Sequence, residues 1–99
     1  MNFQYDEDAS GITVRMTGDL NFSANGDFRG VLERLHAAKG RQVTFDLGGV
    51  PHIDSVGLGL LYIAKEEVGS ARIRLKSPQA SIMKMLELTE ADADFDIVR

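Results

Sequence analysis

Residues Asp46 to Val68 read DLGGVPHIDSVGLGLLYIAKEEV, and the rest of the chain is organised around this stretch. An apolar strand ends at its start, a turn with glycine and proline follows, and Asp54-Ser55 then precedes a long apolar helical pattern. Ser55 is therefore expected at a helix N-terminus, where free amide groups and the helix dipole favour an oxyanion. Two interpretations remain open: Ser55 is a helix cap that contributes about 1 kcal/mol, or it is a phosphorylation switch.

Residues 1–99 have the length of one small globular domain. Apolar residues make up 43% and charged residues 26%, so the composition is that of an ordinary globular chain. There is no run of about 18 apolar residues to predict a membrane span, and the acidic N-terminus lacks the features of a signal peptide, so we expect a cytoplasmic protein. The absence of cysteine excludes disulfides, and the net charge of −4 argues against nucleic acid as the main ligand.

Alternating apolar residues predict an initial pair of strands. Met1–Tyr5 and Gly11–Gly18 are the expected strands, and Asp6–Gly11 is the turn that joins them. In the second strand the apolar residues that alternate with polar ones are Ile12, Val14 and Met16.

One apolar stripe predicts the first helix. Its members lie at i, i+3, i+4 and i+7 and are Phe28, Val31, Leu32 and Leu35. Three residues before the stripe are competent caps, and the sequence does not choose among Asn21, Ser23 and Asn25. Lys39-Gly40 suits the C-terminus of this helix.

Strands and helices then alternate. We expect strands at Gln42–Leu47 and Ala71–Leu75, and Gly69 ends the helix that lies between them. A further helix starts at Ser77-Pro78, and Phe95–Val98 is a candidate closing strand. The packed side of that helix is expected to contain Ile82, Met83 and Leu86, with Met85 as a further candidate. The order β-β-α-β-α-β-α, with a closing β, predicts an α/β fold: a mixed sheet of four or five strands with parallel pairs and about three helices packed on it.

Three features favour a functional Ser55. Gly57 and Gly59 each cost about 1 kcal/mol relative to alanine inside a helix, and they leave the backbone beside the serine accessible. Gly48–His52 is longer than a tight turn requires, which places the serine at a surface rim. A phosphate there would lie near the positive end of the helix dipole but beside Asp54, so it could be tolerated locally and still disrupt an interface.

Catalytic interpretations are weaker. His52 lies three residues before Ser55, but the obvious carboxylate to orient it, Asp54, belongs to the same short loop. The G-x-S-x-G elbow is absent because Ile53 stands at its first glycine position. His36 is expected at the edge of the first helix's apolar stripe, in a structural or surface role. The sequence therefore predicts neither an enzyme nor a metal or cofactor site.

Ile53–Gly59, IDSVGLG, resembles the D-S-x-G-L-G signature of STAS domains, the anti-sigma factor antagonists. Gly18-Asp19-Leu20 is similar to the family's G-E/D-L after the second strand, and Val43–Leu47 is similar to its apolar strand. Ser77-Pro78 and the apolar helix after it resemble the family's last helix. The resemblance covers nearly the whole chain and implies a STAS-like single domain.

The resemblance also implies a function. In that family the serine after the motif aspartate is phosphorylated by a partner that is both serine kinase and anti-sigma factor. The unphosphorylated protein binds that partner and frees the sigma factor, and a separate phosphatase resets it. Matched by position, Ser55 is the implied phosphoacceptor. The implied docking surface contains Asp19, Leu20, Asn21, Ser23, His52, Asp54, Ser55, Val56, Gly57, Leu58 and Gly59.

Two departures from the family pattern keep alternatives open. Val56 stands where many members have a second serine or an alanine, which leaves Ser55 as the only local hydroxyl. Asn21 stands where the best-known members carry an aspartate, which is compatible with a different partner-switching branch, such as one regulated by a response-regulator phosphatase. The alternative function is an accessory STAS-like subunit of a lipid- or anion-transport complex, without a phosphorylation switch. We expect a monomer or a weak dimer, and an exposed apolar patch beside the motif would support the dimer.

Overall fold

The computed structural model describes residues 1–38, 40–69 and 73–99. The predicted order of strands and helices is confirmed. The strands are β1 (Asn2–Asp8), β2 (Gly11–Thr17), β3 (Gln42–Gly49), β4 (Ile73–Lys76) and β5 (Asp96–Val98). The helices are α1 (Asn25–Ala37), α2 (Ser55–Val68) and α3 (Ala80–Leu88), with one-turn 3-10 helices η1 (Phe22–Ala24) and η2 (Ala91–Ala93).

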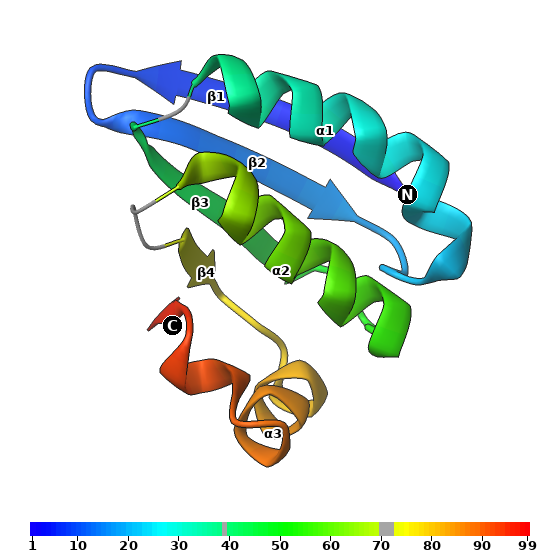
Figure 1. The fold of residues 1–99 in the computed structure, drawn as a ribbon. Coiled ribbons are helices and arrows are strands. Elements are labelled where there is room, and N and C mark those ends of the chain that lie inside the picture. Colours follow the sequence, from blue (N-terminus) through cyan, green and yellow to red (C-terminus); the bar gives the residue numbers. More distant parts are fainter. Residues whose placement is uncertain (39, 70–72) are drawn as a thin grey trace.

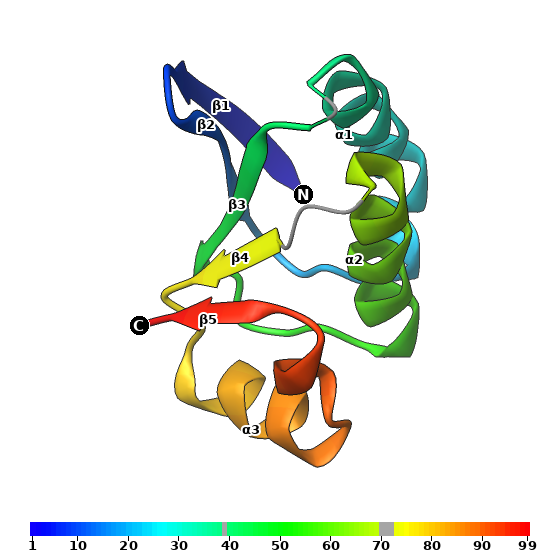
Figure 2. The ribbon, with the colours of Figure 1, turned by 60° about the vertical axis from the view of Figure 1, so that its left-hand side comes forward.

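The five strands form one mixed sheet in the order β1-β2-β3-β4-β5. β1 pairs antiparallel with β2, and every later neighbouring pair is parallel. Each parallel pair is connected through a helix, as parallel strands require. α1 and α2 cover the same face of the sheet, whereas α3 lies beside β4 and β5, away from α1 (Figures 1 and 2). The α/β architecture expected from the sequence is therefore confirmed.

The core lies between the sheet and the helices α1 and α2. Alternate residues of the central strands point into it and are buried: Ile12, Val14, Met16, Val43, Phe45 and Leu47. The apolar stripe of α1 meets them, since Phe28, Val31 and Leu35 are all fully buried. The ring of Phe28 packs between Phe3 and Phe45, with ring centroids 6.0 and 6.1 Å away. Burial of such a side chain contributes about 1.5–3 kcal/mol, so this stripe fixes α1 on the sheet.

β1 is longer than predicted because its turn is tighter. The strand runs to Asp8, whose carboxylate accepts hydrogen bonds from the backbone N–H groups of Ser10 and Gly11 at 2.8 and 3.2 Å. This local bonding closes the hairpin within a short turn. Residues 6–8, predicted as turn, therefore pair with residues 11–13 of β2.

The three candidate caps of the first helix have different roles. Asn21 caps η1, because its side-chain oxygen accepts a hydrogen bond from the N–H of Ser23 at 2.9 Å. α1 itself starts at Asn25 after Ala24, which provides no side-chain cap. The helix ends at Ala37, and Lys39 of the predicted end signal lies outside the described residues.

The predicted start of the last helix at Ser77-Pro78 is wrong. α3 begins at Ala80. Ser77 has a left-handed backbone (φ 56°), and its N–H donates to the carbonyl oxygen of Val98 at 2.6 Å. A contact with β5 therefore uses the residue that the local pattern assigns to a helix cap. Ile82 is buried on the packed side, as expected.

The remaining boundaries differ by a few residues. β3 continues to Gly49 rather than ending at Leu47. α2 ends at Val68, and Gly69 follows with φ 80°, as predicted. β4 covers Ile73–Lys76, and Ala71 of the predicted strand lies outside the described residues. The candidate closing strand is confirmed as β5.

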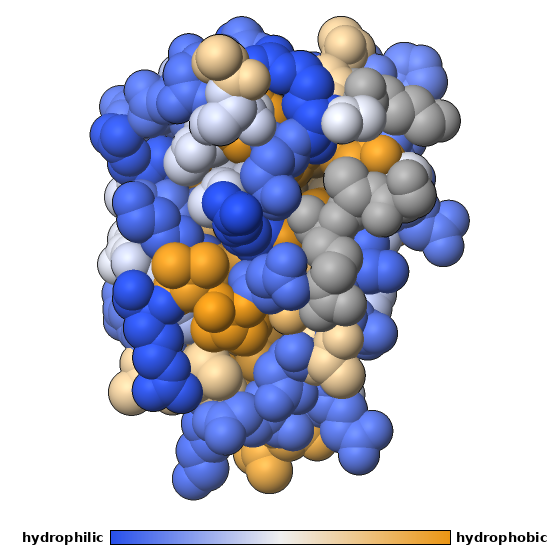
Figure 3. Space-filling model, turned by 90° about the vertical axis from the view of Figure 1, so that its left-hand side faces the viewer, coloured by the Kyte–Doolittle hydropathy of each residue, from blue (hydrophilic) through white to orange (hydrophobic). Residues whose placement is uncertain are grey.

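The face of the molecule seen in Figure 3 is mostly hydrophilic. The end of the molecule seen in Figure 3 carries polar residues around a hydrophobic patch near its centre. In residues 1–38, 40–69 and 73–99, no helix combines the length and the apolar character that crossing a membrane requires.

Candidate functional site

Two loops far apart in the sequence meet at the N-terminus of α2. Leu20 and Ile53 form an isolated parallel bridge. The N–H of Leu20 donates to the carbonyl oxygen of His52 at 3.0 Å, and the N–H of Asp54 donates to that of Leu20 at 3.3 Å. Leu20 is fully buried, and Ile53 packs against the core. The β2–η1 loop and the β3–α2 loop are thus held together by main-chain bonds and buried apolar side chains.

Asp54, not Ser55, caps α2. Its carboxylate accepts a hydrogen bond from the N–H of Gly57 at 2.7 Å, and its backbone is extended, as at a helix N-cap. Its carbonyl accepts the N–H of Leu58 at 2.9 Å. Ser55 is the first helical residue and is exposed. The interpretation of Ser55 as the helix cap is therefore wrong, and the capping contribution of about 1 kcal/mol belongs to Asp54.

Gly57 serves close packing and does not leave the backbone accessible, so that expectation is wrong for this residue. It is buried, and a Cβ atom here would overlap the carbonyl oxygen of Leu20 and lie 2.7 Å from its carbonyl carbon. Gly59 differs, because a Cβ atom there would meet nothing within 4 Å. Gly57 thus allows α2 to approach the β2–η1 loop closely.

The residues that the family resemblance implies for docking differ in how exposed they are to solvent. The exposed ones are Asp19, Ser23, His52, Asp54, Ser55 and Val56. The partly buried ones are Asn21, Leu58 and Gly59, and the buried ones are Leu20 and Gly57. Side chains of the exposed set can touch a partner, whereas Leu20 and Gly57 hold the two loops in place.

Phe22 belongs to the same surface and is absent from the sequence prediction. Its ring is 72% exposed, although a phenylalanine is usually buried. It lies in η1, directly after the cap residue Asn21. The signal that could have identified it is its position outside the apolar stripe of α1. On α2, Val56 and Ile63 are also exposed, at 38% and 50%, which makes the outer surface partly apolar.

The charged residues of the two loops that meet at Ser55 are acidic. Asp19 and Asp54 are exposed there, and neither residues 16–28 nor residues 49–64 contain lysine or arginine. His52 is the one histidine in these two ranges. The other histidine, His36, lies near the C-terminus of α1 and contacts Glu67 at 2.6 Å (Nδ1 to Oε1).

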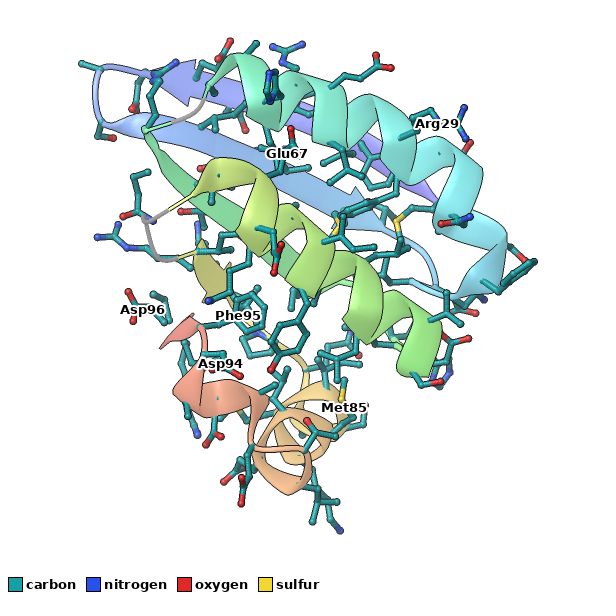
Figure 4. All side chains as sticks on the ribbon, in the orientation of Figure 1. Arg29, Glu67, Met85, Asp94, Phe95 and Asp96 are labelled. Atoms are coloured by element: carbon teal, nitrogen blue, oxygen red, sulfur yellow. The ribbon has the colours of Figure 1, made fainter. Side chains whose placement is uncertain are left out.

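The second half of α2 is attached by side chains. The hydroxyl of Tyr62 donates to a carboxylate oxygen of Asp94 at 2.6 Å, and its ring packs edge-on against Phe95 with centroids 5.1 Å apart. Desolvation by burial, together with the hydrogen bond to Asp94 and the charge of that carboxylate, raises the pKa of Tyr62 to about 12. Asp94 and Phe95 come from the C-terminal segment beside α2 (Figure 4). This contact therefore links α2 to the C-terminal part of the fold.

Four hollows of the described surface are lined by residues other than Ser55 and its loop neighbours. A hollow of about 480 Å³ lies elsewhere, lined by Ser77, Pro78, Ala80, Met83, Glu87 and Arg99. Within the described part of the chain, no group of three or more His, Asp and Glu residues is placed to hold a metal ion. An exposed, capped helix start with apolar neighbours suits contact with another protein.

Comparison with known proteins agrees with this fold. A model of the STAS domain matches residues 2–99. A STAS-domain-containing protein of Pseudomonas aeruginosa (strain UCBPP-PA14) is 29% identical over 92 residues, which are 91% of this chain and 90% of that protein.

Solved structures are similar in fold at low sequence identity. A candidate anti-sigma factor antagonist of Thermotoga maritima has a TM-score of 0.88 at 22% identity, over 98% of this chain and 86% of that one. The phosphorylated form of the Bacillus cell fate determinant SpoIIAA has a TM-score of 0.71 at 17% identity, over 99% and 92%. SpoIIAA is described as an anti-sigma factor antagonist.

Proposed function

The chain belongs to the STAS domain family, and we propose that it is an anti-sigma factor antagonist that works by partner switching. Without phosphate it binds an anti-sigma factor that is also a serine kinase. Phosphorylation of Ser55 releases it, and a serine phosphatase restores the binding form. The observation that carries the proposal is the position of Ser55: first in α2, exposed, and not needed as a cap because Asp54 fills that role.

The phosphoryl transfer requires little from this chain. Ser55 Oγ attacks the terminal phosphorus of a nucleoside triphosphate, the bond from that phosphorus to the diphosphate leaving group breaks, and a base of the kinase takes the hydroxyl proton. The phosphatase reverses the modification with water, which yields inorganic phosphate and the free hydroxyl. This chain supplies an accessible nucleophile at a rigid position.

The added charge accounts for release. A phosphoserine carries a charge of about −1.5 to −2 at neutral pH. A partner docked over the exposed Phe22 and Val56 would remove water from this surface, and burial of an unpaired charge is strongly unfavourable. Asp54 adds like-charge repulsion. The unphosphorylated form is therefore the binding form.

The proposal places the protein in the cytoplasm as a monomer or weak dimer. The test is affinity capture from the host of wild type, Ser55→Ala and Ser55→Asp, with mass spectrometry of the bound proteins and of Ser55. Ser55→Ala keeps the kinase partner but takes up no phosphate, whereas Ser55→Asp binds at least about tenfold more weakly, a change of about 1.4 kcal/mol. Ser81→Ala, which changes an exposed serine of α3, is the matched control and behaves as wild type.

Equal binding of wild type and Ser55→Asp would contradict the proposal. A constitutive partner together with a Ser55 that is never phosphorylated would favour the accessory subunit of a transport complex instead.

A further inference from the structure

His52 lies three residues before the proposed phosphorylation site in the sequence. Its side chain is exposed, and the bridge between the two loops uses only its carbonyl oxygen. Within residues 16–28 and 49–64 it is the one side chain that can become positively charged.

The backbone places His52 on the same face of the loop as Asp54, the residue before Ser55. The chain is extended from His52 to Asp54, and the side chain of Ile53 between them packs on the core. Side chains alternate in extended chain, so His52 and Asp54 share the outer face. Asp54 then reaches the first turn of α2 through its bond to the N–H of Gly57. The Cα atoms of His52 and Asp54 are thus about 7 Å apart along the extended chain, and Asp54 adjoins Ser55.

We infer that His52 is the counter-ion of phosphorylated Ser55, with an imidazolium N–H that donates to a phosphate oxygen. The inference rests on the proposed phosphorylation of Ser55. Because imidazole changes its charge between about pH 5 and 8, the negative charge that the phosphorylated surface presents to a partner depends on pH in the physiological range.

The neighbouring charged residues determine whether the phosphate dianion and the imidazolium are stabilised or destabilised. Asp54 precedes Ser55 directly, and Asp19 faces His52 across the bridge between Leu20 and Ile53. Both carboxylates repel the phosphate dianion and attract the imidazolium. The β4–α3 loop touches the end of β3, where Gln79 donates to the carbonyl oxygen of Gly48 at 3.1 Å. The first charged residue of α3 is Lys84. His52 is therefore the positive group nearest to the phosphate along the chain.

The experiment uses the full chain with phosphoserine installed at position 55 during translation, and follows the second ionisation of the phosphate by 31P NMR at low salt. With His52 in place the ionisation midpoint lies lower by about 0.3–0.5 than in His52→Gln, because the imidazolium favours the dianion. Raising the salt concentration to about 1 M, where the Debye length is about 3 Å, shrinks the difference.

Two further variants make the result decisive. Asp54→Asn keeps a competent cap and lowers the midpoint, because it removes a neighbouring negative charge. His36→Gln is the matched control and leaves the midpoint unchanged, because His36 contacts Glu67 near the other end of α2. An unchanged midpoint in His52→Gln overturns the inference, whether or not Asp54→Asn shifts it. Since the phosphate is installed directly, this result does not depend on whether a kinase modifies Ser55 in the host.

Discussion

At its N-terminal end α2 is positioned by main-chain atoms, whereas its second half is positioned by side chains. The first contact consists of the bridge between Leu20 and Ile53 and the close approach of Gly57 to the carbonyl group of Leu20. The second contact consists of the hydroxyl and ring of Tyr62 against Asp94 and Phe95. Where main-chain atoms do the positioning, the side chains remain free for a partner.

The main-chain contact at the start of α2 is disrupted most directly by a substitution at Gly57. Gly57→Ala places a methyl group on the carbonyl oxygen of Leu20, so either α2 or the β2–η1 loop must move. We expect a loss of about 3 kcal/mol in the free energy of unfolding, measured by urea denaturation.

Gly59→Ala is the matched control, since it adds the same methyl group on the same helix where space is open. It is expected to be neutral or to stabilise the protein by up to about 1 kcal/mol. Similar losses for both variants would mean that helix propensity, not the contact with Leu20, decides the outcome.

A smaller effect is expected at the cap. Asp54→Ala removes the acceptor of the Gly57 N–H and lowers the free energy of unfolding by about 1 kcal/mol. Asp54→Asn retains most of this stability because asparagine is an equally good cap. Ser55→Ala leaves stability unchanged, and a loss as large as that of Asp54→Ala would show that the serine shares the capping role.

The smallest effect is expected at the side-chain contact and depends on pH. The pKa of Tyr62 is raised to about 12, so the folded protein keeps this proton to a higher pH than the unfolded chain, whose tyrosines ionise at about 10. The associated stability is fully present below about pH 10 and is lost as the pH rises from 10 through 12.

Tyr62→Phe tests this contact. It removes the hydrogen bond to Asp94, with an expected loss of about 1 kcal/mol or less in the free energy of unfolding at pH 7. The rate of amide hydrogen exchange should rise in residues 80–98 but not in β1. Between pH 9 and pH 11.5, the urea midpoint of Tyr62→Phe should fall by less than that of wild type. An equal fall in both proteins would assign the alkaline sensitivity to other groups.

The sequence was sufficient to predict a strand or a helix where the apolar pattern is local and repeated. Alternation in Ile12, Val14 and Met16 predicted a strand, and the spacing of Phe28, Val31 and Leu35 predicted a helix face, and each of these residues is buried. The order of elements then limited the fold, because parallel strands need a crossover connection.

The sequence was insufficient to predict a helix start or the role of a residue where a contact with a distant part of the chain overrides the local signal. Ser77-Pro78 has the composition of a helix start, but the N–H of Ser77 bonds to Val98 at the far end of the chain. Asp54 and Ser55 are both good caps, and only the bond to Gly57 distinguishes them. The reason for a glycine at position 57 lies in Leu20, which no local pattern connects to it.

The main-chain bridge between Leu20 and Ile53 also bears on how related chains can diverge. Because it needs only backbone atoms and buried apolar residues, the outward-facing Asp19, Phe22, His52 and Val56 can be replaced with little effect on folding. Paralogues in one cell can therefore share this scaffold and still be insulated from one another's regulators by a handful of surface substitutions. Cross-talk between parallel pathways would then be limited by residues that evolve independently of the core.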